Sequence, residues 1–502
     1  MKNNLFILFA FLIAFSTLSA QKVGLVLSGG GAKGIIHIGV IKALEENNIP
    51  FDYVAGTSMG AVVGGMYSMG LSPDEMIAIL KSDDFKNWSS GQVEPKYVYY
   101  YLNSDPRPSI IDFPLRIHRL DSIRIKPNFL PTNLVSPHQM NFAFVPLFAQ
   151  ANAVANGNFD QLFIPFRCVA SDIYRKEAVV FRQGVLGDAI RASMTYPFMF
   201  KPITIDNRLL FDGGIFNNFP VDVMRDHFDP GIIIGSNVSS NPEKPDETNL
   251  VRQIENMIIN RSDQNITKYD GILFNFKNND ITGFDFNKVD ELVKIGYDST
   301  LHYLDEIKAR IARRVPFSEL TERRNEFRKR FPELKFQNVE ITGIDSLKRK
   351  YIEQIFHYKN EEFTMNDFKE GYYKLISDDK ILEVIPHAIY NPALHNFDLH
   401  LKVKIRDRLK VHLGGNISSS TSNQAYFGLT YQNLKEFAQT AYIDAQFGKM
   451  YNGFGIGSRI EAPTKKNWYM KLGVVVHNFD YFEGTRLFFA DYRTANFSQY
   501  EA

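Results

Sequence analysis

A serine flanked by glycines is the first place in this sequence where residue types and spacing indicate chemistry. Ser58 lies in the pentapeptide Gly56-Thr57-Ser58-Met59-Gly60, which fits the nucleophile elbow, a strained turn from a strand into a helix. Such a turn exposes the serine hydroxyl above a sheet and points the N–H groups of the following helix at the reaction centre. An ordinary glycine-rich turn explains these five residues about equally well, because the pattern is short.

A glycine loop upstream of Ser58 supplies a second component of an acyl-transfer site. The loop follows an apolar run, Val23–Leu27, that predicts a buried strand, and the spacing after Gly34 predicts a helix. Consecutive glycines let backbone N–H groups converge on one point, as the oxyanion of a tetrahedral intermediate requires. The predicted oxyanion loop consists of Gly29, Gly30, Gly31, Ala32, Lys33 and Gly34.

The same loop also fits nucleotide-binding patterns, but less well. Gly29 to Gly34 satisfies GxGxxG, with Asp52 about 20 residues further on, as in a dinucleotide-binding unit. That interpretation leaves Gly56 to Gly60 unexplained. A phosphate-binding P-loop is excluded because Lys33 is followed by Gly34 and not by Ser or Thr.

An aspartate far downstream completes the candidate site. The apolar run Leu209–Phe211 delivers Asp212 onto a turn formed by Gly213 and Gly214. Asp-Gly favours turns by itself, so a purely turn-forming aspartate is the alternative. A carboxylate accepts a proton from serine only in a dry site, where burial raises its pKa above the usual value of about 3.9. His37 follows the glycine loop and is interpreted as packed or solvated, not as the base.

Together the three motifs resemble those of the patatin-like phospholipases. The family pattern is a GGGxRG-type loop, GxSxG and a distant DG[AG]; here they stand as GGGAKG, GTSMG and DGG, in the same order. The resemblance covers residues 22–303 and includes Arg191–Pro197, which is similar to the family's ASxAxPxxF segment. Lys33 replaces the commoner arginine, which keeps the charge but loses a bidentate guanidinium.

The resemblance implies a Ser–Asp dyad, with Ser58 as nucleophile and Asp212 as proton acceptor. It also implies a layered α/β fold with a mostly parallel sheet and helices on both faces, acting on a lipid or phospholipid ester without cofactor or metal. The expected function is therefore a lipid acyl hydrolase. The alternative is an inactive or acyltransferase variant that acts in outer-membrane assembly or secretion through the C-terminal part described below.

The first 20 residues predict a secretory signal peptide, with Lys2, an apolar run Leu5–Phe15 and small residues up to Ala20. The formal net charge of +1 gives no indication of nucleic-acid binding. Cys168 is the single cysteine and lies in an apolar run, so a buried, inert thiol is expected.

The length of 502 residues predicts more than one domain. The hydrolase domain is assigned to residues 22–305. It includes an aromatic-rich stretch, 85–162, that is interpreted mainly as core, with an acyl-chain groove as the alternative. Residues 306–333 predict a basic helical linker broken by Pro316, whose charges are solvated or, as the alternative, contact anionic lipid.

Residues 334–405 predict a small α+β unit in the order strand, helix, helix, strand, strand. The expected ranges are Leu334–Ile341, Ser346–Tyr358, Met365–Ser377, Ile381–Tyr390 and Asn396–Ile405. This order, and the opening segment Phe336–Gly343, resemble a polypeptide-transport-associated (POTRA) domain, a periplasmic module of outer-membrane assembly and secretion proteins.

Residues 408–502 alternate apolar and polar residues in segments of about ten, which is typical of transmembrane β-strands. Examples are Ala425–Tyr431, Thr440–Gln446, Trp468–Val476 and Arg486–Tyr492. A soluble β-sandwich gives similar alternation, but the leader and the POTRA-like unit favour a barrel. Five or six strands fit, fewer than the minimum of about eight, so an incomplete antiparallel barrel or a fragment ending at Ala502 is expected.

The expected location is therefore the outer membrane, with the orientation of the hydrolase left open. The expected partners are a lipid or phospholipid substrate and the membrane itself, contacted by the C-terminal strands. No nucleic acid is expected, and self-association into a homo-oligomer is left open.

Overall fold

The computed structural model describes residues 21–119, 122–125, 133–239, 271–276, 285–356, 362–416, 423–462, 468–480 and 496–501, with isolated positions between 247 and 283. The predicted signal peptide, the predicted strand Arg486–Tyr492 and Ala502 lie outside these residues. The chain divides into two compact units: Met1–Ser90 with Pro146–Glu333, and Gly91–Val145 with Leu334–Ala502.

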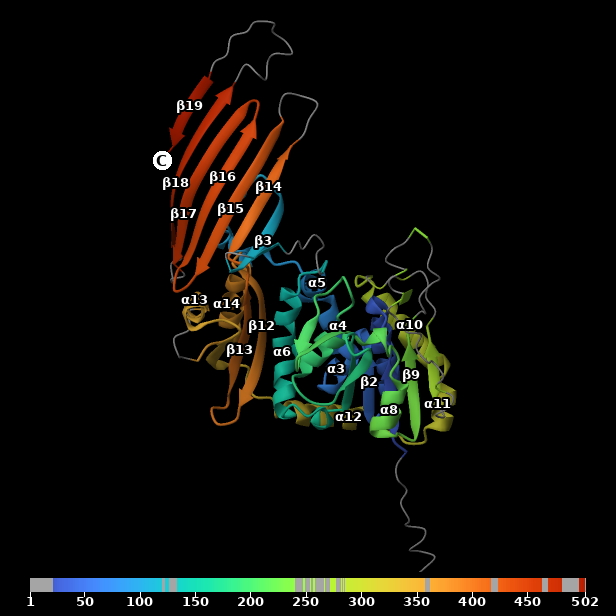
Figure 1. Ribbon diagram of the computed structural model, residues 1–502. Coiled ribbons are helices and arrows are strands. Elements are labelled where there is room, and N and C mark those ends of the chain that lie inside the picture. The colour runs from blue at the N-terminus through green and yellow to red at the C-terminus, as the bar shows by residue number, and fades with distance from the viewer. Residues whose placement is uncertain are drawn as a thin grey trace, which may run out of the picture. The chain divides into compact units, whose positions relative to one another are not determined.

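The first unit is built on a mixed sheet of eight strands (Figure 1). The strand order is β10-β9-β1-β2-β5-β8-β7, with β6 paired to β5. The pairs β10–β9, β9–β1, β1–β2 and β2–β5 are parallel, whereas β6 and β8 run antiparallel to β5. The strands are β1 (Val23–Leu27), β2 (Tyr53–Thr57), β5 (Phe166–Asp172), β6 (Glu177–Phe181), β7 (Ile203–Ile205), β8 (Arg208–Asp212), β9 (Ile232–Asn237) and β10 (Ile272–Asn275). The predicted layered α/β fold is observed, but the sheet is mixed: four of these strand pairs are parallel and three, including β7–β8, are antiparallel.

Helices cover both faces of this sheet, because alternate strand residues point to opposite sides. Val26 of β1 packs into a core cluster with Met224 of α8, whereas Leu27 and Val54 face Gly64 of α3. The helices are α2 (Ile36–Glu46), α3 (Met59–Ser68), α4 (Pro73–Lys81), α5 (Asp83–Ser90), α7 (Leu186–Ser193), α8 (Val221–Phe228), α10 (Val289–His302), α11 (Leu304–Arg310) and α12 (Phe317–Arg328), with short 3-10 turns η1 (Gly31–Ile35), η4 (Phe159–Gln161) and η5 (Gly213–Ile215). A further helix, α6 (His138–Val154), begins in the second unit's residues and ends in the first unit's.

The basic connector, predicted at 306–333, packs within the first unit. It forms α11 and α12, and Pro316 separates them at the N-cap of α12, so the predicted break is confirmed. Arg324 is buried in an ion pair with Glu45, and Arg328 pairs with Glu75 at 2.5 Å. These arginines therefore hold the connector to the rest of the first unit.

The second unit contains a three-stranded sheet in the order β11-β13-β12. Its elements are β11 (Phe336–Thr342), α13 (Ser346–Phe356), α14 (Met365–Ser377), β12 (Ile381–Asn391) and β13 (Asn396–Ile405). The predicted order of strand, helix, helix, strand, strand is confirmed. Thr364 begins α14 through a reciprocal capping box with Asp367, which satisfies two donors at the helix start.

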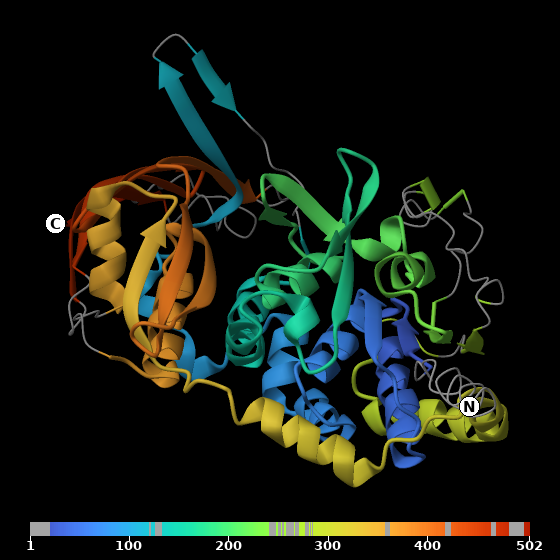
Figure 2. The ribbon, with the colours of Figure 1, turned by 90° about the horizontal axis from the view of Figure 1, so that it is seen from below.

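The second unit also contains an antiparallel sheet in the order β19-β18-β17-β16-β15-β14-β3-β4. Its strands are β3 (Ser109–Arg119), β4 (Ser122–Ile125), β14 (Leu409–Asn416), β15 (Gln424–Leu434), β16 (Ala438–Gly448), β17 (Tyr451–Ala462), β18 (Trp468–Asp480) and β19 (Asn496–Glu501). Three of the predicted segments fall in β15, β16 and β18. Two of the eight strands, β3 and β4, come from a hairpin far upstream (the two blue arrows in Figure 2).

Residues 91–145 differ from the sequence-based assignment, which placed them inside the hydrolase domain. Their strand β3 pairs with β14, with Phe113 opposite Val411. Their aromatic side chains pack on α14: Tyr97 stacks on Tyr373 at 4.8 Å, and the Phe142 ring centre lies 5.1 Å from that of Phe368. This stretch is therefore part of the second unit's core. It belongs there because β3 pairs with a strand that lies about 300 residues further along the sequence.

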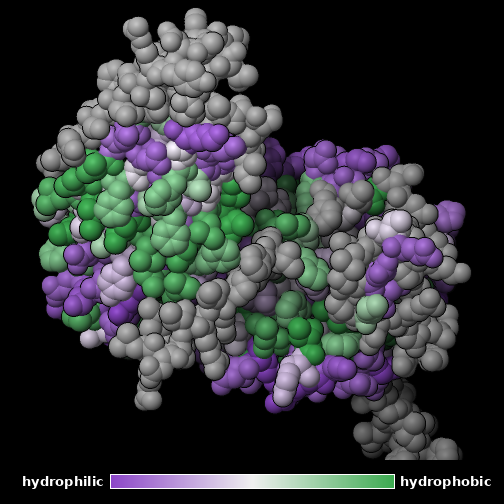
Figure 3. Space-filling view, turned by 45° about the horizontal axis from the view of Figure 1, so that its top comes forward, coloured by the Kyte–Doolittle hydropathy of each residue, from purple (hydrophilic) through white to green (hydrophobic). Residues whose placement is uncertain are grey.

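The antiparallel sheet has one apolar and one polar face. The strand registers align Ile111, Leu413, Phe427, Phe454 and Val476 in one row, and all five are exposed by 40–50%. Residues of the opposite face are polar yet largely buried: His412, Gln432, Thr430, Thr440, Arg459 and Glu461. Figure 3 shows a broad field of hydrophobic side chains on this part of the molecule.

Across the described ranges, no helix combines the length and the apolar character needed to cross a membrane.

Candidate functional site

Ser58 sits at a strained turn between β2 and α3. Its backbone has φ 55° and ψ −124°, a left-handed conformation that costs energy for any residue with a side chain. The flanking residues must be glycine because backbone atoms lie too close to leave room for a side chain. A Cβ on Gly56 would lie 2.4 Å from the Gly60 oxygen, and one on Gly60 would lie 2.4 Å from the Leu27 oxygen. The turn has the geometry of the nucleophile elbow.

Asp212 accepts a hydrogen bond from the Ser58 hydroxyl, with 2.6 Å between Oγ and Oδ2. Strand β8 ends at Asp212, and the Gly214 N–H donates to its other oxygen at 2.7 Å. Burial raises the pKa of Asp212 to about 6, partly offset by these two hydrogen bonds. The two residues, 154 positions apart in sequence, therefore form a pair in which the carboxylate can take the serine proton near neutral pH.

The glycine loop presents fewer free donors than the sequence indicates. The Gly29 N–H donates to the Asn218 carbonyl at 3.1 Å, and the Ala32 N–H donates to the Gly283 carbonyl at 2.8 Å. For the N–H groups of Gly30 and Gly31 no acceptor occurs among the described residues. Lys33 and Gly34 continue into η1, where Gly34 packs against Met59. Within the described part of the chain, the N–H groups of Gly30 and Gly31 therefore remain available to an oxyanion.

An asparagine pair, Asn217 and Asn218, joins the elbow to the glycine loop. The Thr57 hydroxyl donates to the Asn217 carbonyl at 2.9 Å, while the Asn218 carbonyl receives the Gly29 N–H. On the other side of the elbow, Ser193 Oγ accepts the Ser58 N–H at 2.9 Å. Sequence reasoning missed these residues. No residue type marks them in the sequence, because main-chain carbonyls of Asn217 and Asn218 accept the bonds from Thr57 and Gly29.

The Asn218 carboxamide lies beside the nucleophile. A Cβ on Gly29 would lie 2.3 Å from Asn218 Oδ1 and 2.9 Å from Ser58 Cβ, so all three groups border one small space. We expect Asn218→Ala to lower kcat/KM for a soluble ester by roughly tenfold, because the change admits bulk water and removes a polar group at the reaction centre. Asn217→Ala is the matched control, since its side chain donates to Asp222 at 2.7 Å and its carbonyl is kept. Equal kinetics for the two variants would contradict this role.

His37, Cys168 and Asp172 have structural roles. Both ring nitrogens of His37 are bonded, Nδ1 to Ser236 Oγ at 2.8 Å and Nε2 to the Ser28 oxygen at 2.9 Å, and burial lowers its pKa to about 4. It is packed and neutral. Cys168 is buried, which raises its pKa to about 12, in agreement with the predicted inert thiol. Asp172 accepts N–H groups of the turn that follows β5.

The pKa of Asp212 predicts how the reaction depends on pH. Below a pKa of about 6 the carboxyl group is protonated and cannot accept the serine proton, so the rate should fall about tenfold per pH unit on acidification and stay level above pH 7. A pH–rate profile with a soluble ester measures this. The His37→Ala variant should keep the same lower limb if it folds. Loss of that limb in the variant would assign the titration to His37.

The fold and this geometry define an α/β domain with a serine on a nucleophile elbow and a buried aspartate as its partner. Residues 25–225 match the family of patatin-like phospholipases, so this part of the chain is a patatin-like phospholipase domain.

Known proteins are similar to part of this chain. The chain is 31% identical over 210 residues to a patatin-like phospholipase domain-containing protein of Caenorhabditis elegans (41% of this chain, 13% of that protein). It is 30% identical over 214 residues to a lysophospholipase of Kluyveromyces lactis (43% and 12%). The chain thus spans less than half the length of these relatives. The structure of VipD from Legionella pneumophila aligns with a TM-score of 0.30 and 14% identity, over 57% of this chain and 67% of that chain, a similarity too low to bear on activity.

Proposed function

We propose that this protein hydrolyses carboxylic esters of lipids through a Ser58–Asp212 dyad. The observation that carries the proposal is the 2.6 Å hydrogen bond from the Ser58 hydroxyl to a buried carboxylate whose pKa is raised to about 6. The family match of residues 25–225 supports a lipid ester as the substrate class.

In the first step Ser58 Oγ bonds to the ester carbonyl carbon while its proton passes to Asp212 Oδ2. The carbonyl electrons move onto oxygen, and the N–H groups of Gly30 and Gly31 hold that oxyanion. The carbon–oxygen bond to the alcohol then breaks, and Asp212 returns the proton to the leaving alkoxide. A water molecule hydrolyses the acyl-serine by the same sequence, releasing a fatty acid and regenerating Ser58.

Burial is what makes a carboxylate adequate as the base. In water an aspartate is too weak to deprotonate an alcohol, but desolvation raises its proton affinity and the oxyanion donors lower the energy of the product side. Proton transfer in the transition state therefore needs to be only partial.

A fluorophosphonate probe tests the proposed nucleophile directly. We expect covalent labelling of the native chain at Ser58, identified by mass spectrometry, because such probes react with serines that a base has activated. Ser58→Ala should abolish labelling, and the exposed Ser90 should remain unlabelled. Absence of labelling in a folded native chain, or labelling at another serine, would overturn the proposal.

We further propose that the antiparallel sheet of the second unit contacts the outer membrane as part of a transmembrane β-barrel. Exposed apolar rows opposite a buried polar face are unfavourable in water. The same arrangement suits a barrel whose outer face meets lipid and whose inner face is polar. The element order of residues 334–405 supports the companion proposal of a POTRA-like module.

A further inference from the structure

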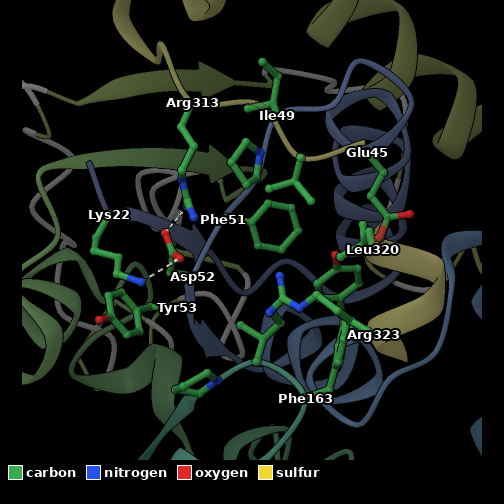
Figure 4. Close-up of a pocket in the computed structure, with 15 residues that line it drawn as sticks. Lys22, Glu45, Ile49, Phe51, Asp52, Tyr53, Phe163, Arg313, Leu320 and Arg323 are labelled. Atoms are coloured by element: carbon green, nitrogen blue, oxygen red, sulfur yellow. Dashed lines mark hydrogen bonds and ion pairs between the residues drawn. The ribbon is translucent and has the colours of Figure 1, made fainter. Parts of the chain in front are cut away.

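A pocket lies at the opposite end of the first unit's sheet from Ser58. Its volume is about 300 Å³, and its lining includes Lys22, Asp52 and Tyr53 at the amino ends of β1 and β2 (Figure 4). Ser58 follows the carboxyl end of β2, about 17 Å away along a five-residue strand. We call this space the amino-end pocket; it is separate from the dyad.

The base of the amino-end pocket is apolar. Phe51, Tyr67 and Phe163 line it, with ring centroids 4.8 Å apart for Phe51–Tyr67 and 6.2 Å for Tyr67–Phe163. Ile49 and Leu320 add aliphatic surface. A hydrocarbon chain of a ligand would replace water against these side chains, which is favourable.

The rim of the pocket carries an excess of positive charge. In Figure 4, Lys22 and Arg313 both reach Asp52, which pairs with Lys22 at 3.2 Å and with Arg313, so two cations share one carboxylate. The other lining carboxylate, Glu45, is already bonded by Arg324 and by the Tyr67 hydroxyl at 2.7 Å.

Arg323 is a third cation at the rim. It is exposed, and among the described residues no carboxylate pairs with it. An anionic group at this rim would meet Arg323 and two cations that share one carboxylate, with which it can form charge-assisted hydrogen bonds.

The basic connector closes one side of the pocket. The Val315 N–H donates to the Asn48 carbonyl at 3.0 Å, and the Phe317 N–H donates to the Asn48 side chain at 3.0 Å. These bonds fix the start of α12, the helix that carries Leu320 and Arg323. Arg313 and Arg323 of the connector line the pocket, and this placement explains part of the connector's basic composition.

We propose that the amino-end pocket binds an aliphatic monocarboxylate, with its head group at Arg323 and its chain against Phe51 and Phe163. The volume of about 300 Å³ corresponds to roughly ten water molecules at about 30 Å³ each, so the pocket suits a ligand with about that many non-hydrogen atoms, such as octanoate. The planar guanidinium fork matches a carboxylate, and the pocket has no room for a diacyl lipid. This site does not depend on the proposed hydrolase activity.

The test uses the full chain in non-ionic detergent and octanoate as the probe. Calorimetry should show binding to the native chain and to Ser58→Ala with equal affinity. Arg323→Gln should weaken binding at least about tenfold, as expected for one lost charge-assisted hydrogen bond. Lys329→Gln, which removes a positive charge beyond the end of α12 and outside the pocket, is the matched control and should bind normally. The neutral analogue 1-octanol should bind more weakly than octanoate.

A diazirine-bearing octanoate locates the bound probe. We expect cross-links in peptides that contain residues 49–53, 163–165 or 313–323. Cross-links confined to peptides around Ser58 and Asp212 would assign the binding to the dyad instead and overturn the proposal. No measurable octanoate binding, or equal affinity for native chain and a folded Arg323→Gln, would overturn it as well.

Discussion

Replacing Ser58 by alanine or Asp212 by asparagine is expected to lower the turnover of a lipid ester by at least about 10³-fold. In the proposed dyad the two residues divide nucleophile and proton acceptor between them, and groups that act as a unit lose most of their effect when either is removed. Steady-state rates with a short-chain ester and with a lysophospholipid measure the loss. The double variant should be no slower than the slower single variant, since each change removes the same reaction path.

The thermal stability of the Asp212→Asn variant shows whether its loss of turnover comes from the missing base or from misfolding. Burial raises the pKa of Asp212 to about 6, so between pH 4 and 6 the folded chain keeps a proton that the unfolded chain releases. The ionised carboxylate therefore destabilises the fold at neutral pH, an effect absent below pH 4 and complete above pH 6. Asparagine stays neutral, so the variant should melt at or above the temperature of the parent at pH 8. Near-full activity in a folded Asp212→Asn variant would rule out aspartate as the base.

The local elements of the hydrolase domain are predictable because each depends on residues close in sequence. Val23–Leu27 was predicted as a strand, and β1 has the same bounds. Gly56 and Gly60 signal the elbow because only glycine tolerates the backbone contacts of that turn. The Ser58–Asp212 pairing was inferred from three motifs in order, and the structure places these side chains in hydrogen-bonding contact.

The details of the site that sequence reasoning missed depend on tertiary hydrogen bonds. Nothing in a run of glycines tells which N–H groups are free, since the acceptors of Gly29 and Ala32 are carbonyls about 190 and 250 residues away. The same holds for the asparagine pair, whose main-chain oxygens, not side chains, receive the Thr57 hydroxyl and the Gly29 N–H.

The grouping of residues 91–145 was missed for a related reason. The alternation of apolar and polar residues in 109–119 is typical of any half-buried strand, and β14, the strand that pairs with this segment, begins almost 300 residues later. The register nevertheless explains the composition: Asp112 faces His412, with 2.7 Å between Oδ1 and Nδ1, while Ile111 and Phe113 continue the apolar rows. Strand pairing at this separation has no local sequence signal.

Arginine on the apolar face of the antiparallel sheet is expected to prevent stable membrane association, whereas arginine on the polar face is not. Ile443 and Ile456 are opposite each other on β16 and β17 and are both exposed. If this face meets lipid, each change to arginine costs roughly 2–4 kcal/mol near the bilayer midplane. The Ile443→Arg/Ile456→Arg double variant should therefore lose most of its membrane-bound fraction.

Gln446→Arg is the matched control for this experiment. Gln446 lies on β16 opposite Tyr426, on the polar face, and its side chain contacts Gln424 at 3.0 Å. An arginine there can remain in a polar, hydrated setting and should leave membrane association unchanged. The measurement is recovery of the protein in membranes after high-salt washing, which removes peripheral proteins. Two outcomes would contradict a lipid-facing sheet: recovery of the parent in the soluble fraction, or equal membrane binding of the double variant and the parent. Either outcome would favour a partner protein that covers the apolar rows, because large apolar patches exposed to water mark interaction sites.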